Sequence, residues 1–167
     1  MKNTYYLKQS PLIFLALALI ISSCTKIPGH YINGNTTTTG ATFTYQLGSA
    51  ASVTLTTPSH LISFAQANAG GPDVTVISAF NISTSDNIGL QFDATQPGTY
   101  TSSFGYFEVG ALKLHVPPGG ETIKVTTYNF ADNGQQLKGT IKGSFSGFMA
   151  DSLNNQVKFS GSFNITQ

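Results

Sequence analysis

The chain has 167 residues, a length that suits one domain of ordinary size. Charged residues make up only 9%, there is no Trp, and all eight basic residues are Lys. A helical bundle would need far more Glu, Lys, Leu and Ala. A nucleic-acid binder would need a basic face, and a disulfide-stapled fold would need more than one Cys. These exclusions leave a small β-rich domain with uncharged polar faces and no nucleic acid as a partner.

The first segment has the features of an export signal. Lys2 and Lys8 precede the uncharged apolar run 11–21. That run is shorter than the roughly 20 residues that cross a bilayer and has the length of a signal h-region. It ends in Ile-Ser-Ser-Cys at 21–24, in the order apolar, small, small, Cys. This resembles the lipobox of bacterial lipoproteins, in which the signal is cut before the Cys and the Cys is acylated. The alternative is an ordinary secretory signal with a coincidental Cys.

We expect three segments: a signal peptide over 1–23, as the lipoprotein resemblance implies, a lipidated flexible tether over 24–40, which has little periodicity, and a single β domain over 41–167. We expect Cys24 to be lipidated and to hold the chain on a membrane through its acyl chains. Several acyl chains together anchor stably, whereas one binds only marginally. In the tether, Tyr31 and Ile32 could alternatively add an edge strand to the β domain.

Residues after Cys24 also bear on location. Some related lipoproteins are held in the inner membrane by an Asp directly after the Cys, and this chain has Thr25 there. Acidic residues near the Cys send others to the cell surface, and 25–30 contains none. We therefore expect a bacterial outer-membrane location with the domain facing the periplasm, with the cell surface as the alternative. From Cys24 onward the chain has six Lys and seven acidic residues, so it is nearly neutral. This argues against electrostatic steering of a highly charged partner.

From residue 41 onward, apolar residues recur at alternate positions, which is typical of half-buried strands. Gly- and Pro-containing breakers separate the runs. The expected strands cover 42–47, 53–56, 61–67, 74–82, 88–93, 99–109, 112–116, 122–130, 136–149 and 157–165. The run 61–67 would also suit one helical turn. About nine or ten short strands predict an all-β domain, an antiparallel β-sandwich or a barrel-like fold.

The last two runs predict a strand register. Residues 141–149 and 157–165 each have one apolar and one mainly polar face, and 151–155 joins them as a loop. Pairing the two apolar faces places every inward Gly opposite a Phe, which covers the gap that the Gly leaves. The resulting pairs are Gly143–Phe163, Phe145–Gly161 and Gly147–Phe159. The Asp-Asn-Gly sequence at 132–134 predicts a preceding hairpin turn, so the C-terminal strands should form a meander.

This C-terminal pattern also resembles that of small β-rich bacterial envelope lipoproteins. The matching residues are Gly-Ser-Phe-Ser-Gly at 143–147 and Gly-Ser-Phe-Asn-Ile at 161–165. The family has no assigned activity, so the resemblance implies a fold and an envelope location but carries over no catalytic residues.

Residues capable of chemistry are few and scattered. No two of His30, His60 and His115 share the spacing of a metal pair, and acylation would leave no Cys thiol. Asp93 and Glu108 could meet on neighbouring strands as a carboxylate pair, although solvated side chains are the simpler interpretation. No nucleophile elbow, phosphate loop or calcium loop occurs. We expect no catalytic residues, no metal and no cofactor.

Two features suggest a functional role. Tyr100, Phe104 and Tyr106 would share one face of a regular strand and could stack on a sugar ring or an apolar ligand if exposed. The alternative is that they fill the core. Ser152, in the sequence Asp-Ser-Leu, resembles the acceptor of some bacterial O-glycosylation systems and lies in an expected loop.

These features together predict a non-enzymatic envelope lipoprotein that binds or scaffolds an unknown ligand. One alternative is a glycan- or small-ligand-binding protein that uses the aromatic surface. Another is a structural subunit of an outer-membrane complex that docks on an envelope protein partner by a strand edge.

Overall fold

The computed structural model describes residues 40–67, 73–117, 119–132 and 137–167, which contain ten strands and no helix. They belong to one compact unit. No helix long and apolar enough to cross a bilayer occurs in this described part of the chain. The predicted leader, Cys24, the tether up to residue 39 and the expected turn at 133–136 lie outside the described residues.

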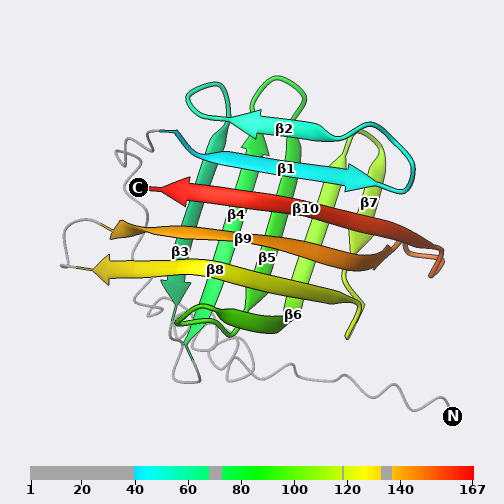
Figure 1. Cartoon of the computed structure of the whole chain (residues 1–167). Coiled ribbons are helices and arrows are strands. Elements are labelled where there is room, and N and C mark those ends of the chain that lie inside the picture. The colour runs from blue at the N-terminus through cyan, green and yellow to red at the C-terminus, as the bar shows by residue number, and fades with distance from the viewer. Residues whose placement is uncertain (1–39, 68–72, 118, 133–136) are drawn as a thin grey trace, which may run out of the picture. The chain divides into compact units, whose positions relative to one another are not determined.

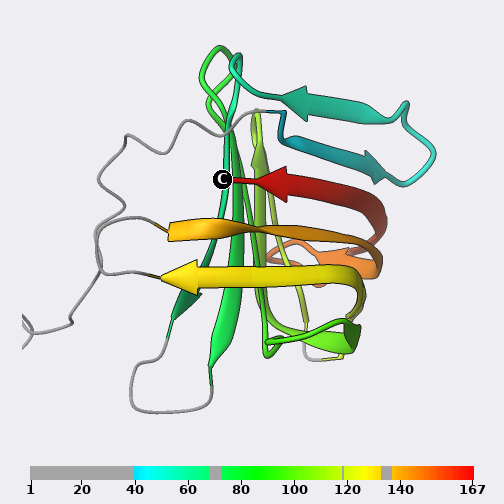
Figure 2. The same ribbon diagram turned by 60° about the vertical axis from the view of Figure 1, so that its left-hand side comes forward.

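The strands form one continuous antiparallel sheet that folds over into two layers. Their bounds are β1 Thr42–Leu47, β2 Val53–Thr56, β3 Leu61–Ala67, β4 Val74–Asn81, β5 Asp86–Phe92, β6 Gly98–Val109, β7 Leu112–His115, β8 Glu121–Asp132, β9 Leu137–Ala150 and β10 Gln156–Thr166. The first layer runs β2-β1-β10-β9-β8, and the second runs β3-β4-β5-β6-β7. The strands of the two layers cross steeply in Figure 1, and the layers face each other in Figure 2. The predicted all-β, sandwich or barrel-like fold is confirmed.

Strand β6 belongs to both layers. Its first residues, Gly98–Thr101, pair with β8, and its last residues pair with β5 and β7. Strand β7 in turn meets β9 through His115 and Ala150. Strands β6, β7, β9 and β8 therefore close a small barrel-like corner at one end of the sandwich.

The C-terminal meander has the predicted register. Strands β8, β9 and β10 are consecutive neighbours, and each inward Gly of β9 and β10 lies opposite a Phe. The observed pairs are Gly143–Phe163, Phe145–Gly161 and Gly147–Phe159. A Cβ atom built at Gly161 would lie 2.4 Å from the ring of Phe145 and 2.0 Å from the carbonyl oxygen of Thr44 on β1. Because Gly161 has no side chain, the Phe145 ring can cover it and the backbone of β1 can approach it closely.

Aromatic rings link the two layers through the core. Phe43 and Phe145 stack with centroids 5.4 Å apart, and Phe145 and Phe159 stack at 4.7 Å. Phe159 then meets Phe107 of the second layer edge-on at 5.3 Å. Burial of several such rings supplies much of the hydrophobic stabilisation, at about 25 cal/mol for each Å² removed from water.

Gly161→Ala should lower the free energy of unfolding by about 1–3 kcal/mol, because the new methyl group would overlap both a ring and a backbone oxygen. Ser162→Ala is the matched control, since Ser162 is the next residue and is exposed; its effect should stay within about 0.5 kcal/mol. Urea unfolding followed by circular dichroism measures both. Equal stability of the two variants would contradict the packing described for the meander.

Candidate functional site

A bulge in β6 determines which aromatic side chains reach the surface. Gln91 pairs with Phe104 but its neighbour Phe92 pairs with Ser102, so Ser103 is an extra residue in β6. An extra residue reverses which alternate positions face inward. Accordingly Ser102 is buried before the bulge, whereas Phe104 is 53% exposed after it.

The prediction that Tyr100, Phe104 and Tyr106 share one face is therefore wrong for Tyr100. Its ring packs against the buried Phe92 at a centroid distance of 6.2 Å. Its hydroxyl donates a hydrogen bond to the carbonyl oxygen of Gln96, at 2.8 Å. Tyr100 contributes to the core before the bulge, as the core-filling alternative for this cluster proposed.

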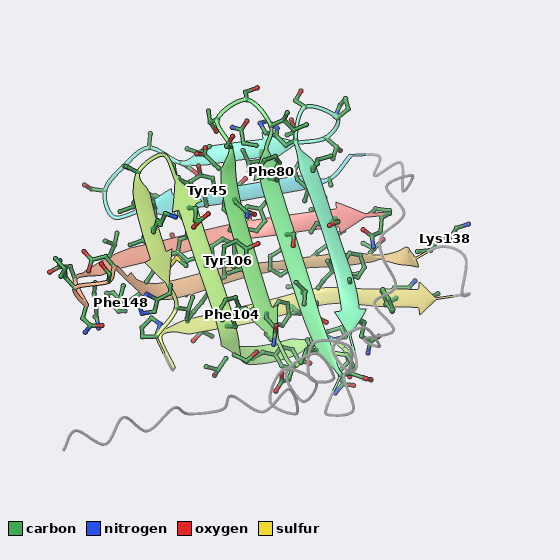
Figure 3. All side chains as sticks on the ribbon, turned by 180° about the vertical axis from the view of Figure 1, so that it is seen from behind. Tyr45, Phe80, Phe104, Tyr106, Lys138 and Phe148 are labelled. Carbon is green, nitrogen blue, oxygen red and sulfur yellow. The ribbon has the colours of Figure 1, made fainter. Side chains whose placement is uncertain are left out.

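Phe104 and Tyr106 form an aromatic platform on the outer face of the second layer (Figure 3). Their ring centroids are 6.0 Å apart. The Tyr106 ring covers Gly89 on β5, where a Cβ atom would lie 2.2 Å from the ring. Its hydroxyl donates to the Asn87 side-chain oxygen at 3.2 Å, which fixes the direction of the ring. The platform thus has one well-held ring and one more exposed ring.

Toward β5, β4 and β3, the outer face beside the aromatic platform carries small or uncharged side chains. In register with Tyr106 and Gly89 are Ser78 on β4 and Ser63 on β3, all on the outer face. The next row contains Phe104, Gln91, Val76 and Ala65. Amide and hydroxyl groups therefore lie beside the two rings on a shallow sheet surface.

The titratable side chains described on this face lie on β6 and β7. The exposed His115 on β7 is directly opposite Tyr106. In the next row Glu108 on β6 pairs with Lys113 on β7, with 3.2 Å between the carboxylate oxygen and Nζ. The two opposite charges neutralise each other, so this pair adds little net field to the face. The arrangement suits an uncharged ligand better than an ionic one.

Glu121 is a buried carboxyl group that sequence analysis did not single out as a site. Its side chain is 1% exposed, and neither of its oxygens has a hydrogen-bond partner in the described part of the chain. Burial raises its pKa to about 7, and the nearby Ser102 hydroxyl offsets part of that rise. The signal was present in the sequence, because Glu121 continues the inward alternation of Ile123 and Val125 on β8.

The carboxylate pair proposed from the sequence does not form. Glu108 lies opposite Asn87, near the start of β5, whereas Asp93 follows the end of that strand. Six residues of extended chain separate Asn87 from Asp93, or about 20 Å. Asp93 and Glu108 therefore do not meet, in line with the simpler interpretation of two separate side chains. The described residues include no group of three or more His, Cys, Asp or Glu that could hold a metal ion.

Ser152 lies exposed in the turn between β9 and β10, where an exposed loop was expected. Asp151 organises this turn, since its carboxylate accepts hydrogen bonds from the backbone N–H groups of Leu153 and Asn155 at 2.8 and 2.9 Å. Hydrogen bonds from Asn155 lower the Asp151 pKa. Glycosylation of Ser152 stays a prediction, as does lipidation of Cys24, which lies outside the described residues.

Comparison with protein-family models, with curated proteins and with solved structures finds no match to this chain.

Glu121→Gln should flatten the dependence of stability on pH. Because burial raises the folded-state pKa of Glu121, the wild-type protein should lose stability as the pH rises from about 4.5 through 7. Between pH 5 and pH 8 that loss should be about 2 kcal/mol, and the Gln variant should lack it. Urea unfolding at both pH values measures the difference. Parallel curves for the two proteins would show that Glu121 is ionised at little cost.

Proposed function

We propose that this chain is a lipid-anchored bacterial envelope protein whose β domain binds a neutral ligand on the aromatic platform. The ligand class that best fits is a glycan, which offers an apolar ring face and surrounding hydroxyl groups. The anchor is Cys24, and the domain stands away from an outer membrane, on its periplasmic side, at the end of the tether.

One observation carries this proposal: Phe104 is 53% exposed and lies beside Tyr106 on a sheet face without net charge. The bulge at Ser103 turns both rings outward, although a regular strand continuing from Tyr100 would bury them. Binding faces combine apolar contact area with a few polar groups that set orientation. Here the rings supply the area, and Asn87, Ser78 and Gln91 supply the polar groups.

We propose a binding role rather than a catalytic one because the acidic side chains of Glu108, Asp151 and Glu121 either hold another interaction or lie away from the platform. Glu108 pairs with Lys113, and Asp151 holds a turn. Glu121 lies inside the barrel-like corner, behind the sheet rather than on the aromatic face. General acid–base work needs a free group within hydrogen-bond reach of a bound ligand. Glu108 is the acid nearest the platform, and its carboxylate is held by Lys113.

The alternative role, a structural subunit that docks by a strand edge, has less support. The edge strand β3 is partly occupied, since the Phe64 N–H donates to Gln167 Oε1 at 3.3 Å and Gln167 Nε2 donates to the Phe64 carbonyl at 2.6 Å. The other edge strand, β2, has only four residues. Short or covered edges are typical of sheets that resist the addition of a further strand.

Phe104→Ala and Tyr106→Ala should each weaken glycan binding roughly tenfold, because each removes one stacking ring. The probes are neutral polysaccharides, namely cellulose, xylan, chitin and dextran, measured by pull-down or affinity electrophoresis. Phe148→Ala is the matched control, since Phe148 is 43% exposed but lies on the other layer. Tyr100→Ala should instead cost about 2 kcal/mol of stability.

Two outcomes would count against the glycan proposal. One is that none of these polysaccharides retains the wild-type protein. The other is that Phe104→Ala and Phe148→Ala bind equally well while both remain folded.

Cys24→Ala should abolish incorporation of a labelled fatty acid when the chain is expressed in a bacterium that makes lipoproteins. The variant should also move from the membrane fraction to the soluble fraction, because the acyl chains supply the stable attachment. Gel fluorography after metabolic labelling measures the first effect. Label that persists in the variant would rule out Cys24 as the anchor.

A further inference from the structure

The outer face of the first layer gathers most of the positive charge of the β domain. Four exposed lysines lie on it: Lys124 on β8, Lys138 and Lys142 on β9 and Lys158 on β10. Lys124, Lys142 and Lys158 each stand next to a buried residue that faces the core, and Lys138 shares the alternation of Lys142 on β9. The remaining lysine of the described residues, Lys113, lies on the other layer and pairs with Glu108.

None of the described side chains on this face is acidic. Glu121 belongs to β8 but points inward, and Asp151 sits in the turn after β9. Asp86 is buried beside β6, where it accepts a hydrogen bond from the Gly110 N–H. The near-zero net charge of the chain therefore conceals a local excess of positive charge on the outer face of the first layer.

The four lysines are spread out rather than convergent. Lys124 lies opposite Ser144, two residues from Lys142, so their Cα atoms are about 8 Å apart. Lys138 and Lys158 lie toward opposite ends of the layer. Between them the outward positions are mostly hydroxyl-bearing, including Thr44, Ser146 and Ser162. Such spacing suits a planar array of separate negative charges better than one compact anion.

Exposed apolar side chains lie at one end of the lysine face. Phe148 on β9 is 43% exposed and lies directly opposite Lys158 in the strand register. Leu153, in the following turn, is 80% exposed. Soluble polyanions have no apolar interior for these side chains to enter. A lipid bilayer offers both an anionic surface and an apolar interior beneath it.

We infer that the lysine face docks on an anionic lipid bilayer, with Phe148 and Leu153 at the depth of the headgroups. This inference adds to the proposed function the orientation of the domain on the membrane. It rests on the proposed function only in that the Cys24 anchor brings the domain to a membrane. A basic surface is a second attachment signal that adds to acyl chains. Because the aromatic platform is on the other layer, docking in this way leaves the platform facing away from the membrane.

The test is co-sedimentation with vesicles of phosphatidylcholine containing 0, 20 or 40% phosphatidylglycerol. The protein begins at residue 24 and carries Cys24→Ser, so that neither the leader nor an acyl chain contributes; the first described residue of the domain, Gly40, comes later. Binding should increase with phosphatidylglycerol and fall with salt, because salt screens exposed charges. Lys124→Gln and Lys142→Gln should each weaken it roughly fivefold at low ionic strength.

The matched control is Lys113→Gln, which makes the same change of charge on the other layer and should leave vesicle binding unchanged. Equal weakening by all three lysine variants would overturn the inference, since only net charge would then matter. No binding to 40% phosphatidylglycerol at low salt would also overturn it. Retention on heparin without vesicle binding would assign the face to a soluble polyanion instead. The polysaccharide assay on the same protein separates any of these failures from failure of the glycan proposal.

Discussion

The architecture depends on one strand, β6, which forms its hydrogen bonds in both layers of the sheet. Its first part bonds to β8 and its last part to β5 and β7, so the chain must turn sharply between them. The extra residue Ser103 accommodates that turn and at the same point exchanges the inner and outer faces of the strand. Closure of the sandwich and exposure of the aromatic platform therefore have a common cause. A strand without the bulge could not place Tyr100 in the core and Phe104 on the surface.

Sequence reasoning succeeded where alternation is regular. Residues 141–149 and 157–165 keep strict period two, and their inward Gly and Phe residues fit together in only one register, so the meander was predictable. The same reasoning failed at β6, because Ser103 looks like any other polar strand residue. A bulge is decided by how neighbouring strands must bend, and that information is distributed over β5, β7 and β8. Phe104 and Tyr106 could be identified as candidates, but the loss of Tyr100 from the group could not.

The lysine face could have been predicted from the sequence. The predicted meander places the strands of Lys124, Lys142 and Lys158 side by side in one layer, and alternation turns all three side chains outward. Summing the charges of the chain hid this face, because the sum does not show where the charges lie. Glu121 differs from these, since its alternation with Ile123 predicted burial directly. Periodicity predicts which face of a strand a side chain occupies. Topology decides which strands share a layer, and so which surface of the molecule that side chain reaches.

The amide of Gln167 has a consequence for how the domain opens. It joins the end of β10 to the Phe64 backbone of β3, on the side of the sandwich away from the β6 crossing. At this side the layers are also joined by the short turn from β2 to β3 and by the packing of Phe64 on Tyr128 and Phe130 of β8. Side-chain hydrogen bonds and ring contacts hold an edge strand less firmly than a strand ladder on both sides. Local breathing should therefore start at β3, where amide protons would exchange with solvent ahead of those in the meander.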